Sequence, residues 1–241
     1  MAPAGSGLGG SSSLAIATAT ALCRLSGRPL PPLRRLSVVR DIETQVLGIP
    51  AGEQDYYAAL YGGAASIEWL PGGGRRESLP VDLDALRART VLCYSGASRS
   101  SARSNWDMLR RRIDGEARVT RAMDGIASAA RQMRGALQSG NWSKAGRVLA
   151  EEMSWREQLS PLVASGPVRS LLKVAGAAGA WGGKVCGAGG GGCLVFLAPV
   201  GACRSVGAAL RKSGATLLEF QFVRGGATVT SNPTSRVVRW Q

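Results

Sequence analysis

The sequence predicts an α+β fold in which short strands are interspersed with long helices. Apolar residues recur at helical spacing over several long stretches, and shorter apolar runs have the length and composition of strands. Two glycine-rich runs, residues 3–12 and 184–192, lie near opposite ends of the chain. Strands and helices that alternate in this way are typical of an α+β sandwich.

The predicted helices end at glycine or proline. The first follows the N-terminal glycine run directly, and Gly27 with three nearby prolines ends it. In the second, apolar residues recur at helical spacing up to Leu47, and Gly48 ends it. The predicted helical ranges are 13–25, 33–47, 98–159 with breaks at Gly115 and Gly140, 168–178 and 202–213.

The predicted strands are shorter runs rich in apolar residues. Apolar and polar residues alternate in the longest of them, as in a half-buried strand. A turn rich in glycine and arginine, residues 72–76, separates the first two. The predicted strand ranges are 66–70, 91–94, 193–198 and 214–223, with a last strand around residues 228–230 or 237–240.

The first glycine run favours a phosphate-binding loop. Residues 5–10 satisfy G-x-G-x-x-G, but almost nothing precedes them to form a strand, and the first acidic residue of the chain is Asp41. A Walker loop is excluded because no Gly-Lys-Ser/Thr closes the run. A glycine loop that opens a helix points free backbone N–H groups at an anion. A Gly/Ser linker or a frayed terminus is the alternative.

Several segments resemble one family in chain order. The pattern Pro3-x-x-x-Gly-Leu-Gly-x-Ser-Ser12 and the pattern Lys184-x-x-Gly-Ala-Gly-Gly-Gly-Gly192 are similar to the second and third motifs of the GHMP small-molecule kinases. Residues 42–63, 94–100 and 151–155 most resemble the branch of the D-glycero-D-manno-heptose 7-phosphate kinases. The resemblance implies a GHMP-kinase-like two-domain fold. Residues 1–97 would be an incomplete N-terminal ATP-binding domain, a remnant of the ribosomal S5 domain 2-like fold, and residues 98–241 a ferredoxin-like C-terminal domain.

The resemblance also implies ATP and Mg²⁺ as cofactors and a sugar or sugar phosphate as the substrate. Asp55 would contact the acceptor hydroxyl as the catalytic carboxylate, and Glu43 with Ser11 would hold the metal. Arg99 would bind a substrate phosphate. The residues implied to bind ATP are Pro3, Gly5, Ser6, Gly7, Leu8, Gly9, Gly10, Ser11 and Ser12, and the other residues implied to bind substrate are Gly187, Gly189, Gly190 and Gly191.

Each of these residues also has a structural interpretation. Glu43 could be a solvated helix acid beside Asp41, and Asp55 could cap a helix after Gly52. A like charge at Glu53 could raise the pKa of Asp55. The other interpretations are a surface arginine for Arg99, a structural or strand-start lysine for Lys184, and a tight turn without a ligand for the second glycine run.

Two departures from the family pattern affect the expected activity. The first motif of the family has no counterpart, and Gly10 stands where relatives usually carry Ser or Thr. Without the strands of a complete N-terminal domain, the side chains of Leu14, Ile16 and Leu22 would lose part of their burial, at about 1.5–3 kcal/mol for each fully exposed large side chain. We therefore expect weak or no kinase activity from residues 1–241 alone.

Composition excludes several other functions. The chain has no histidine, which removes Ser-His-Asp sites, Cys-His sites and histidine-ligated zinc sites. No run of roughly 18 apolar residues is free of charge or glycine, so no membrane span is expected. Five cysteines without a C-x-x-C pair favour small buried thiols in a reducing compartment, hence the cytoplasm.

The net charge of +14 leaves nucleic-acid binding to be considered. The 30 basic residues lack the interleaved aromatic residues of a base-stacking surface. An arginine-rich surface that tolerates anionic substrates is therefore favoured over a nucleic-acid face. A catalytically incomplete remnant that binds nucleotide or a partner without turnover is the main alternative to a kinase.

Overall fold

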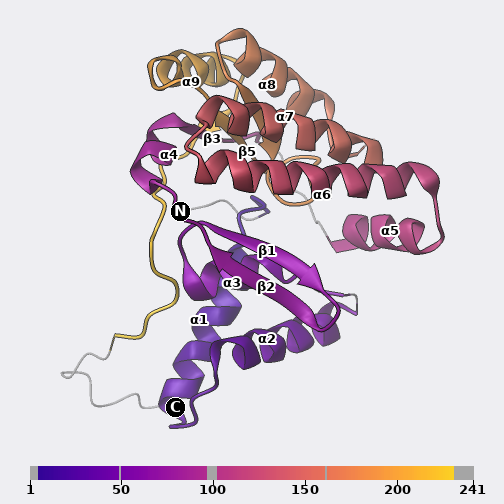
Figure 1. The fold of residues 1–241 in the computed structure, drawn as a ribbon, viewed down its shortest axis with the longest axis vertical. Coiled ribbons are helices and arrows are strands. Elements are labelled where there is room, and N and C mark those ends of the chain that lie inside the picture. Colours follow the sequence, from indigo (N-terminus) through magenta and orange to yellow (C-terminus); the bar gives the residue numbers. More distant parts are fainter. Residues whose placement is uncertain (1–4, 49, 97–101, 161, 231–241) are drawn as a thin grey trace.

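The computed structural model describes residues 5–48, 50–96, 102–160 and 162–230. Helices and a hairpin from the first third of the chain form one part of the molecule, and a four-stranded sheet with its helices forms the other (Figure 1). The first part contains α1 (Gly10–Leu25), α2 (Pro32–Leu47), α3 (Gln54–Tyr61), β1 (Ala65–Leu70) and β2 (Gly73–Ser78). The second contains α4 (Leu83–Arg89), β3 (Thr90–Tyr94), α5 (Ala102–Ile113), α6 (Ala117–Gln138), α7 (Trp142–Leu159), α8 (Gly166–Ala177), β4 (Gly182–Val185), β5 (Cys193–Leu197), a 3₁₀ turn (Val200–Ala202), α9 (Cys203–Lys212) and β6 (Thr216–Leu217).

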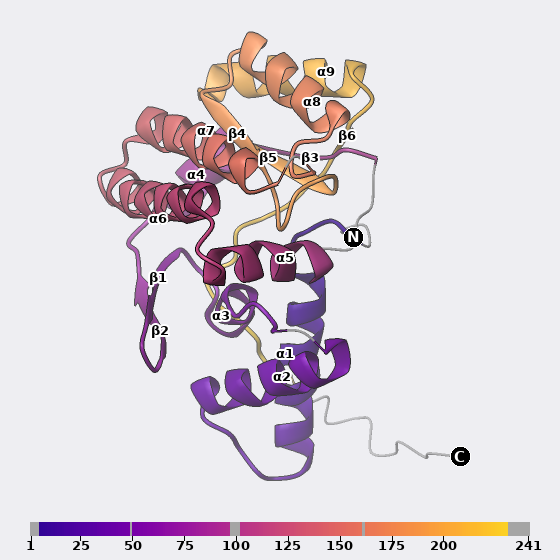
Figure 2. The same cartoon turned by 90° about the vertical axis from the view of Figure 1, so that its right-hand side faces the viewer.

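The sheet of the second part is antiparallel, with the order β4-β5-β3-β6. The register pairs Thr90 with Leu197 and Tyr94 with Cys193. The paired helices α6 and α7 lie on one side of the sheet, and α8 and α9 lie on the other (Figure 2). Since β3 and β5 are buried almost throughout, their near-continuous apolar sequences are what a covered central strand requires.

Glycine lets α7 approach the sheet closely. A Cβ atom at Gly182 in β4 would lie 2.1 Å from the carbonyl oxygen of Gly146 in α7, and a Cβ atom at Gly146 would lie 2.4 Å from the Cβ of Trp181. Any larger residue at either position would push the helix away from the strand. The contact fixes the position of α7 relative to β4, and both elements carry residues of the site described below.

The first part has its own small core, made of Ile16, Leu36, Val39, Tyr56 and Tyr57 from α1, α2 and α3. Ile16 is fully buried, so the expectation that it loses burial is wrong: residues of α2 and α3 cover it.

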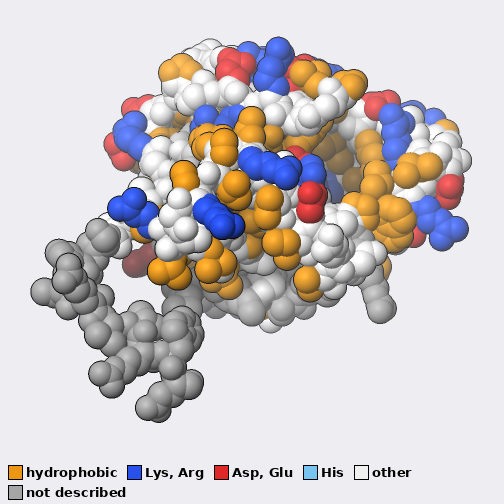
Figure 3. All heavy atoms as spheres, turned by 90° about the horizontal axis from the view of Figure 1, so that it is seen from below, with side chains coloured by type: hydrophobic (Ala, Val, Ile, Leu, Met, Phe, Trp, Pro, Cys, Tyr) orange, Lys and Arg blue, Asp and Glu red, His pale blue; other side chains and the backbone are white. Residues whose placement is uncertain are grey.

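Leu14 and Leu22 behave as expected, because their side chains are 69% and 58% exposed. Seen from the end that carries α1 and α2, apolar side chains are interspersed with Lys and Arg (Figure 3).

Of the predicted turn at residues 72–76, only Gly72 lies in a turn. Pro71 and Gly72 make the turn, and the following residues form β2, which pairs antiparallel with β1 from Ala65↔Ser78 to Leu70↔Gly73. An ion pair of 2.5 Å between Glu68 and Arg75 joins the two strands. The second strand was missed because its sequence, Gly-Gly-Arg-Arg-Glu-Ser, has no apolar alternation.

The predicted strand at 214–223 is also wrong for most of its length. Only Thr216 and Leu217 are in β6, and the chain then runs on as an extended segment toward the first part of the molecule. The N–H of Gly63 donates to the carbonyl of Val223 at 2.8 Å, and the N–H of Ala227 donates to the carbonyl of Ala59 at 2.8 Å. The segment thus joins the two parts through single backbone bonds.

Residues 228–230 form no strand, and residues 237–240 lie outside the described part of the chain. All five cysteines are free, but only Cys93 and Cys193 are fully buried, whereas the other three are partly exposed. Among the described helices, none is long and apolar enough to cross a membrane.

Candidate functional site

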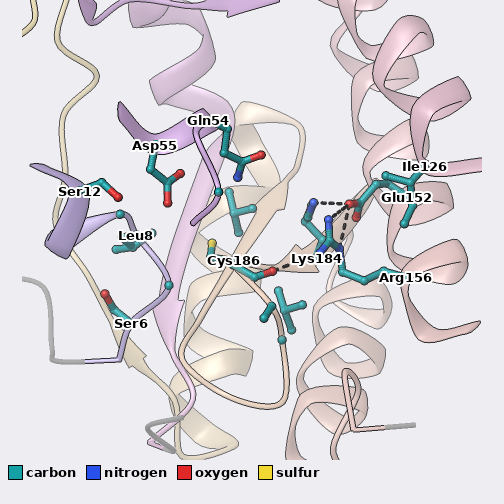
Figure 4. A pocket seen from close by; sticks show the side chains of 18 of the residues that line it. Ser6, Leu8, Ser12, Gln54, Asp55, Ile126, Glu152, Arg156, Lys184 and Cys186 are labelled. Atoms are coloured by element: carbon teal, nitrogen blue, oxygen red, sulfur yellow. Dashed lines mark hydrogen bonds and ion pairs between the residues drawn. The ribbon is translucent and has the colours of Figure 1, made fainter. Parts of the chain in front are cut away.

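A cavity of about 1280 Å³ lies between the two parts of the molecule. Its walls come from the first glycine run, the end of α2, the start of α3, helices α6 and α7, strand β4 and the second glycine run (Figure 4). Residues from both ends of the sequence therefore face one space.

The first glycine run forms a tight loop that ends at the N-terminus of α1. Gly5, Gly7 and Gly9 have φ values of 69°, 74° and 69°, a conformation that side chains with a Cβ rarely adopt. Gly9 is the N-cap of α1, and no side chain caps this helix end. The N–H groups of the first turn are therefore free of a side-chain acceptor, as in an anion-binding helix terminus.

The two glycine runs meet backbone to backbone. A Cβ atom at Gly7 would lie 2.6 Å from the carbonyl oxygen of Cys186, and one at Gly192 would lie 2.8 Å from the carbonyl oxygen of Ser6. The N–H of Cys193 donates to that same Ser6 oxygen at 2.8 Å. The contact needs glycine on both sides, because a side chain on either run would occupy the space of the other backbone.

The remaining glycines of the second run differ in their surroundings. Gly187, Gly189 and Gly191 line the cavity. The N–H of Gly190 instead donates to the carbonyl of Val163 at 2.6 Å. Substrate binding by these four glycines stays a prediction. Pro3 and Arg99 lie outside the described residues.

Asp55 lies against the first glycine loop. A Cβ atom at Gly9 would be 3.1 Å from the Cγ of Asp55, so the carboxyl group packs directly beside the N-terminus of α1. Asp55 is not a helix cap, because Glu53 occupies that position and Asp55 lies in the first turn of α3. Burial raises the pKa of Asp55, whereas Glu53, which forms an ion pair with Arg40 at 2.7 Å, is not among the causes.

Glu43, on α2, also lines this side of the cavity. The hydroxyl of Tyr56 donates to its carboxylate, and burial together with the charge of Asp55 raises the pKa of Glu43. Glu43 is half-buried on its helix and is bound by Tyr56, whereas its neighbour Asp41 pairs with Arg40 at 2.7 Å. The charge of Asp55 thus adds to burial in raising the pKa of Glu43, and a cation between the two carboxylates would relieve this cost.

These donors suit Mg²⁺ bound together with phosphate, but not a metal cage made by protein alone. Within the described ranges, no group of three acidic or sulfur ligands could hold an ion. Magnesium is usually bound through one or two carboxylates plus substrate phosphates. Glu43, Asp55 and the hydroxyls of Ser11 and Ser12 all line the cavity, with Ser11 exposed and Ser12 buried. The residues present fit such an ion.

The opposite wall carries a cluster that sequence analysis did not assign to the site. Lys184 Nζ lies 2.6 Å from Glu152 Oε1, and Arg156 Nη2 lies 2.5 Å from the same oxygen (Figure 4). Arg156 also donates to the carbonyl of Gly187 at 3.3 Å. Lys184 lies inside β4 and not at its start, which corrects the strand-start interpretation. The spacing of Glu152 and Arg156 on one helix face was the available signal.

Removing the charge of Glu43 should stabilise the ligand-free protein. Because the pKa of Glu43 is raised in the folded state, the ionised form costs stability above the folded pKa, and this cost disappears as the pH falls below its ordinary value of 4.5. We expect Glu43→Gln to raise the melting temperature at pH 7 and to match the wild type near pH 4. The control is Glu219→Gln, at an exposed glutamate. Thermal melts that show Glu43→Gln less stable than the wild type at pH 7 would contradict this.

Comparison with known proteins agrees with the geometry. Residues 1–63 match the family description "GHMP kinases N terminal domain", and residues 133–216 match "GHMP kinases C terminal". The chain is 30% identical over 232 residues to a D-glycero-alpha-D-manno-heptose 7-phosphate kinase of Campylobacter jejuni, covering 93% of this chain and 67% of that protein. It is 29% identical over 205 residues to a mevalonate kinase of Thermococcus sibiricus, covering 82% of this chain and 57% of that protein.

Solved structures show the same relation. A putative sugar kinase from Campylobacter jejuni superimposes with a TM-score of 0.70 at 30% identity, covering 93% of this chain and 65% of that one. A D-glycero-D-manno-heptose 1-phosphate kinase from Bacteroides thetaiotaomicron gives a TM-score of 0.71 at 26% identity, covering 95% and 66%. The chain thus spans about two thirds of the length of these relatives. By sequence and by fold, it belongs to the GHMP kinase family.

Proposed function

We propose that this chain is an ATP-dependent kinase that transfers the γ-phosphate to a hydroxyl of a sugar or sugar phosphate. The observation that carries the proposal is the position of Asp55 against Gly9, where a carboxylate meets the uncapped N-terminus of a helix. A phosphoryl donor held at that terminus would have its reacting end beside a carboxylate that can orient or deprotonate the acceptor. Phosphoryl transfer needs little more from a protein than such positioning and charge stabilisation.

The first glycine run would bind the phosphates of ATP. Its left-handed glycines turn the backbone so that no Cβ fills the loop, and the first N–H groups of α1 add hydrogen-bond donors and the positive helix end. We assign this role to the described residues of the run, from Gly5 to Ser12. Pro3 is assigned to it on the sequence motif alone.

Asp55 would act at the acceptor hydroxyl. A carboxyl group with a raised pKa is a better proton acceptor near neutral pH than an ordinary aspartate. Its place in the first turn of α3 and its contact with Gly9 would direct it toward a phosphate held by the loop. In this proposal Asp55 orients the hydroxyl and takes its proton as the phosphoryl group is transferred.

Glu43 and Ser11 would hold Mg²⁺ next to the phosphates, with Tyr56 fixing the carboxylate of Glu43. When bound, the ion supplies positive charge that neutralises the phosphate oxygens. The chain's own contribution is to place two carboxylates beside the loop, where they are unbalanced without a cation.

The acceptor that fits best is a sugar phosphate of the heptose 7-phosphate kind. The relative from Campylobacter jejuni is by name a heptose 7-phosphate kinase, and the cavity is large enough for a sugar phosphate beside a nucleotide. The glycines of the second run, Gly187 to Gly191, would shape the acceptor side, and Arg99 is proposed as a phosphate contact on its sequence motif. The free cysteines favour a reducing compartment such as the cytoplasm.

The assignment of the nucleotide site predicts the effect of filling the first loop. Mg-ATP should raise the melting temperature of the wild type, because it binds the folded state. Gly7→Val should abolish this shift, since its side chain would collide with the carbonyl of Cys186. The control is Gly135→Ala in α6, outside the cavity lining, where a Cβ meets no atom within 4 Å and the backbone needs no positive φ. Equal Mg-ATP stabilisation in the wild type and Gly7→Val would reject the site.

The role of Asp55 predicts a separate effect on turnover. The wild-type chain should turn over weakly, and Asp55→Asn should lower its kcat for ADP release by about 10²–10⁴ with a heptose 7-phosphate acceptor. It should leave the thermal shift with Mg-ATP nearly unchanged. Asp84→Asn, at a side chain that is 96% exposed, is the control. Unchanged turnover in Asp55→Asn would contradict the proposed role. ATP binding without turnover in the wild type would instead favour a catalytically incomplete nucleotide-binding protein.

A further inference from the structure

The cluster of Lys184, Arg156 and Glu152 on the far wall of the cavity has a net positive charge. Lys184 and Arg156 converge on one oxygen of Glu152, so two cations share a single carboxylate. The other oxygen, Oε2, is buried and accepts no hydrogen bond from the described residues. A buried ion pair that served only to join α7 to β4 would be expected to balance its charges and use both carboxylate oxygens.

The acidic and basic residues of the cavity lie on opposite sides. Apart from this cluster and the thiol of Cys186, the ionisable residues described on the cavity wall are the acids Glu43, Glu53 and Asp55, which lie on the side of the first glycine run. Lys184 and Arg156 are the basic residues described on that wall, and both lie on the opposite side (Figure 4). The cavity is therefore acidic at one end and basic at the other.

Lys184 and Arg156 have donors left for a ligand. Within the described part of the chain, Lys184 donates only to Glu152, and its ammonium group carries three N–H bonds. Burial lowers the pKa of Lys184, and the charge of Arg156 lowers it further, while Glu152 partly restores it. An anion beside the two cations would relieve their repulsion. The apolar side chains of Ile126 and Met133, which line the same wall, would exclude water and strengthen such a bond.

We infer that Lys184 and Arg156 form a subsite for the phosphate group that the acceptor already carries. The inference rests on the proposed kinase function. The nucleotide phosphates are assigned to the first glycine run, whose N–H groups and carboxylates lie across the cavity from this cluster. An acceptor whose reacting hydroxyl lies at Asp55 would place a phosphate at its far end against the two cations. Glu152 is a positioning residue, which holds both side chains toward one point.

The bond from Arg156 to the carbonyl of Gly187 adds a structural link to this subsite. Gly187 packs against Gly7, since a Cβ atom at Gly187 would lie 3.2 Å from the Cα of Gly7. The subsite is thus attached to the same backbone contact that shapes the nucleotide loop. Its distance from Asp55 is fixed by the fold and selects acceptors of matching length.

The test uses inorganic phosphate as the probe, titrated by calorimetry into the full chain saturated with Mg-AMPPNP. The wild type should bind phosphate, and Lys184→Gln and Arg156→Gln should each weaken binding by about 10-fold. The matched control is Arg147→Gln, at an exposed arginine of the same helix that does not line the cavity. Phosphate affinity equal to the wild type in both Lys184→Gln and Arg156→Gln would overturn the subsite.

A second variant covers the case in which Lys184→Gln does not fold. The double variant Lys184→Gln with Glu152→Gln keeps the net charge of the cluster and leaves no buried carboxylate without Lys184. It should still lose about 10-fold in phosphate affinity, because the ammonium donor is gone. Wild-type affinity in this variant would contradict a direct contact by Lys184. Lys184→Arg, which keeps the charge, should bind within about threefold of the wild type.

The same titrations separate this inference from the proposed function. If Mg-AMPPNP fails to bind while phosphate binding still depends on Lys184, the two cations bind phosphate, but the kinase proposal falls and the assignment of that phosphate to a kinase acceptor falls with it. If Mg-AMPPNP binds normally and phosphate binding does not depend on Lys184, the subsite falls and the kinase proposal stands. If Lys184→Gln weakens Mg-AMPPNP itself and AMPPNP displaces phosphate, the cations belong to the nucleotide site, which also overturns the inference.

Discussion

The site depends on the contact between two glycine-rich backbones. Gly7 lies against the carbonyl of Cys186, and the carbonyl of Ser6 accepts the N–H of Cys193, so the start of the chain is held against β5. The contact places the N-terminus of α1 at the edge of the cavity and orients the loop before it. The two parts are also joined by the packing of Leu79, Val81 and Leu83 against Leu137 and Trp142, and by the extended segment after β6.

The contact also explains the distribution of charge in the cavity. Helices α3 and α2 place the carboxylates of Asp55 and Glu43 near the loop, where burial raises the pKa of Asp55, and burial together with the charge of Asp55 raises the pKa of Glu43. On the other side of the second glycine run, β4 and α7 place Lys184 and Arg156. An arrangement with unsatisfied charge of opposite sign at its two ends costs stability in the ligand-free protein. Such costs are typical of sites that bind charged ligands.

Local sequence signals predicted the elements that glycine or proline delimits. The first two helices follow from the glycine run, the break at Gly27 and the end at Gly48, and the buried strands β3 and β5 follow from their apolar runs. The apolar pattern failed to predict secondary structure where tertiary contacts determine the conformation of the chain. In the predicted strand 214–223, only Thr216 and Leu217 have a strand neighbour in the sheet, and Leu218 and Val223 each make a single backbone bond to another segment.

Sequence motifs predicted only some of the residues that line the cavity. Glu43 and Asp55 lie in segments that resemble the family, and the structure brings both to the loop. The role of Lys184 was not predictable, because its partner Glu152 lies far earlier in the chain. The two meet only because Gly146 and Gly182 let α7 and β4 approach closely. Motifs thus indicated single candidate residues, whereas contacts between residues of different segments could be identified only from the three-dimensional structure.

The most direct test of the account is an NMR titration of ¹⁵N-labelled protein with Mg-AMPPNP. If the two glycine runs form one phosphate-binding unit, the backbone amides of residues 5–12 and of residues 187–192 should shift together, with a single dissociation constant. The amides of α8 and α9 should not shift. Shifts confined to one run, or to the surface of the molecule away from both runs, would contradict the claim that their contact builds the site.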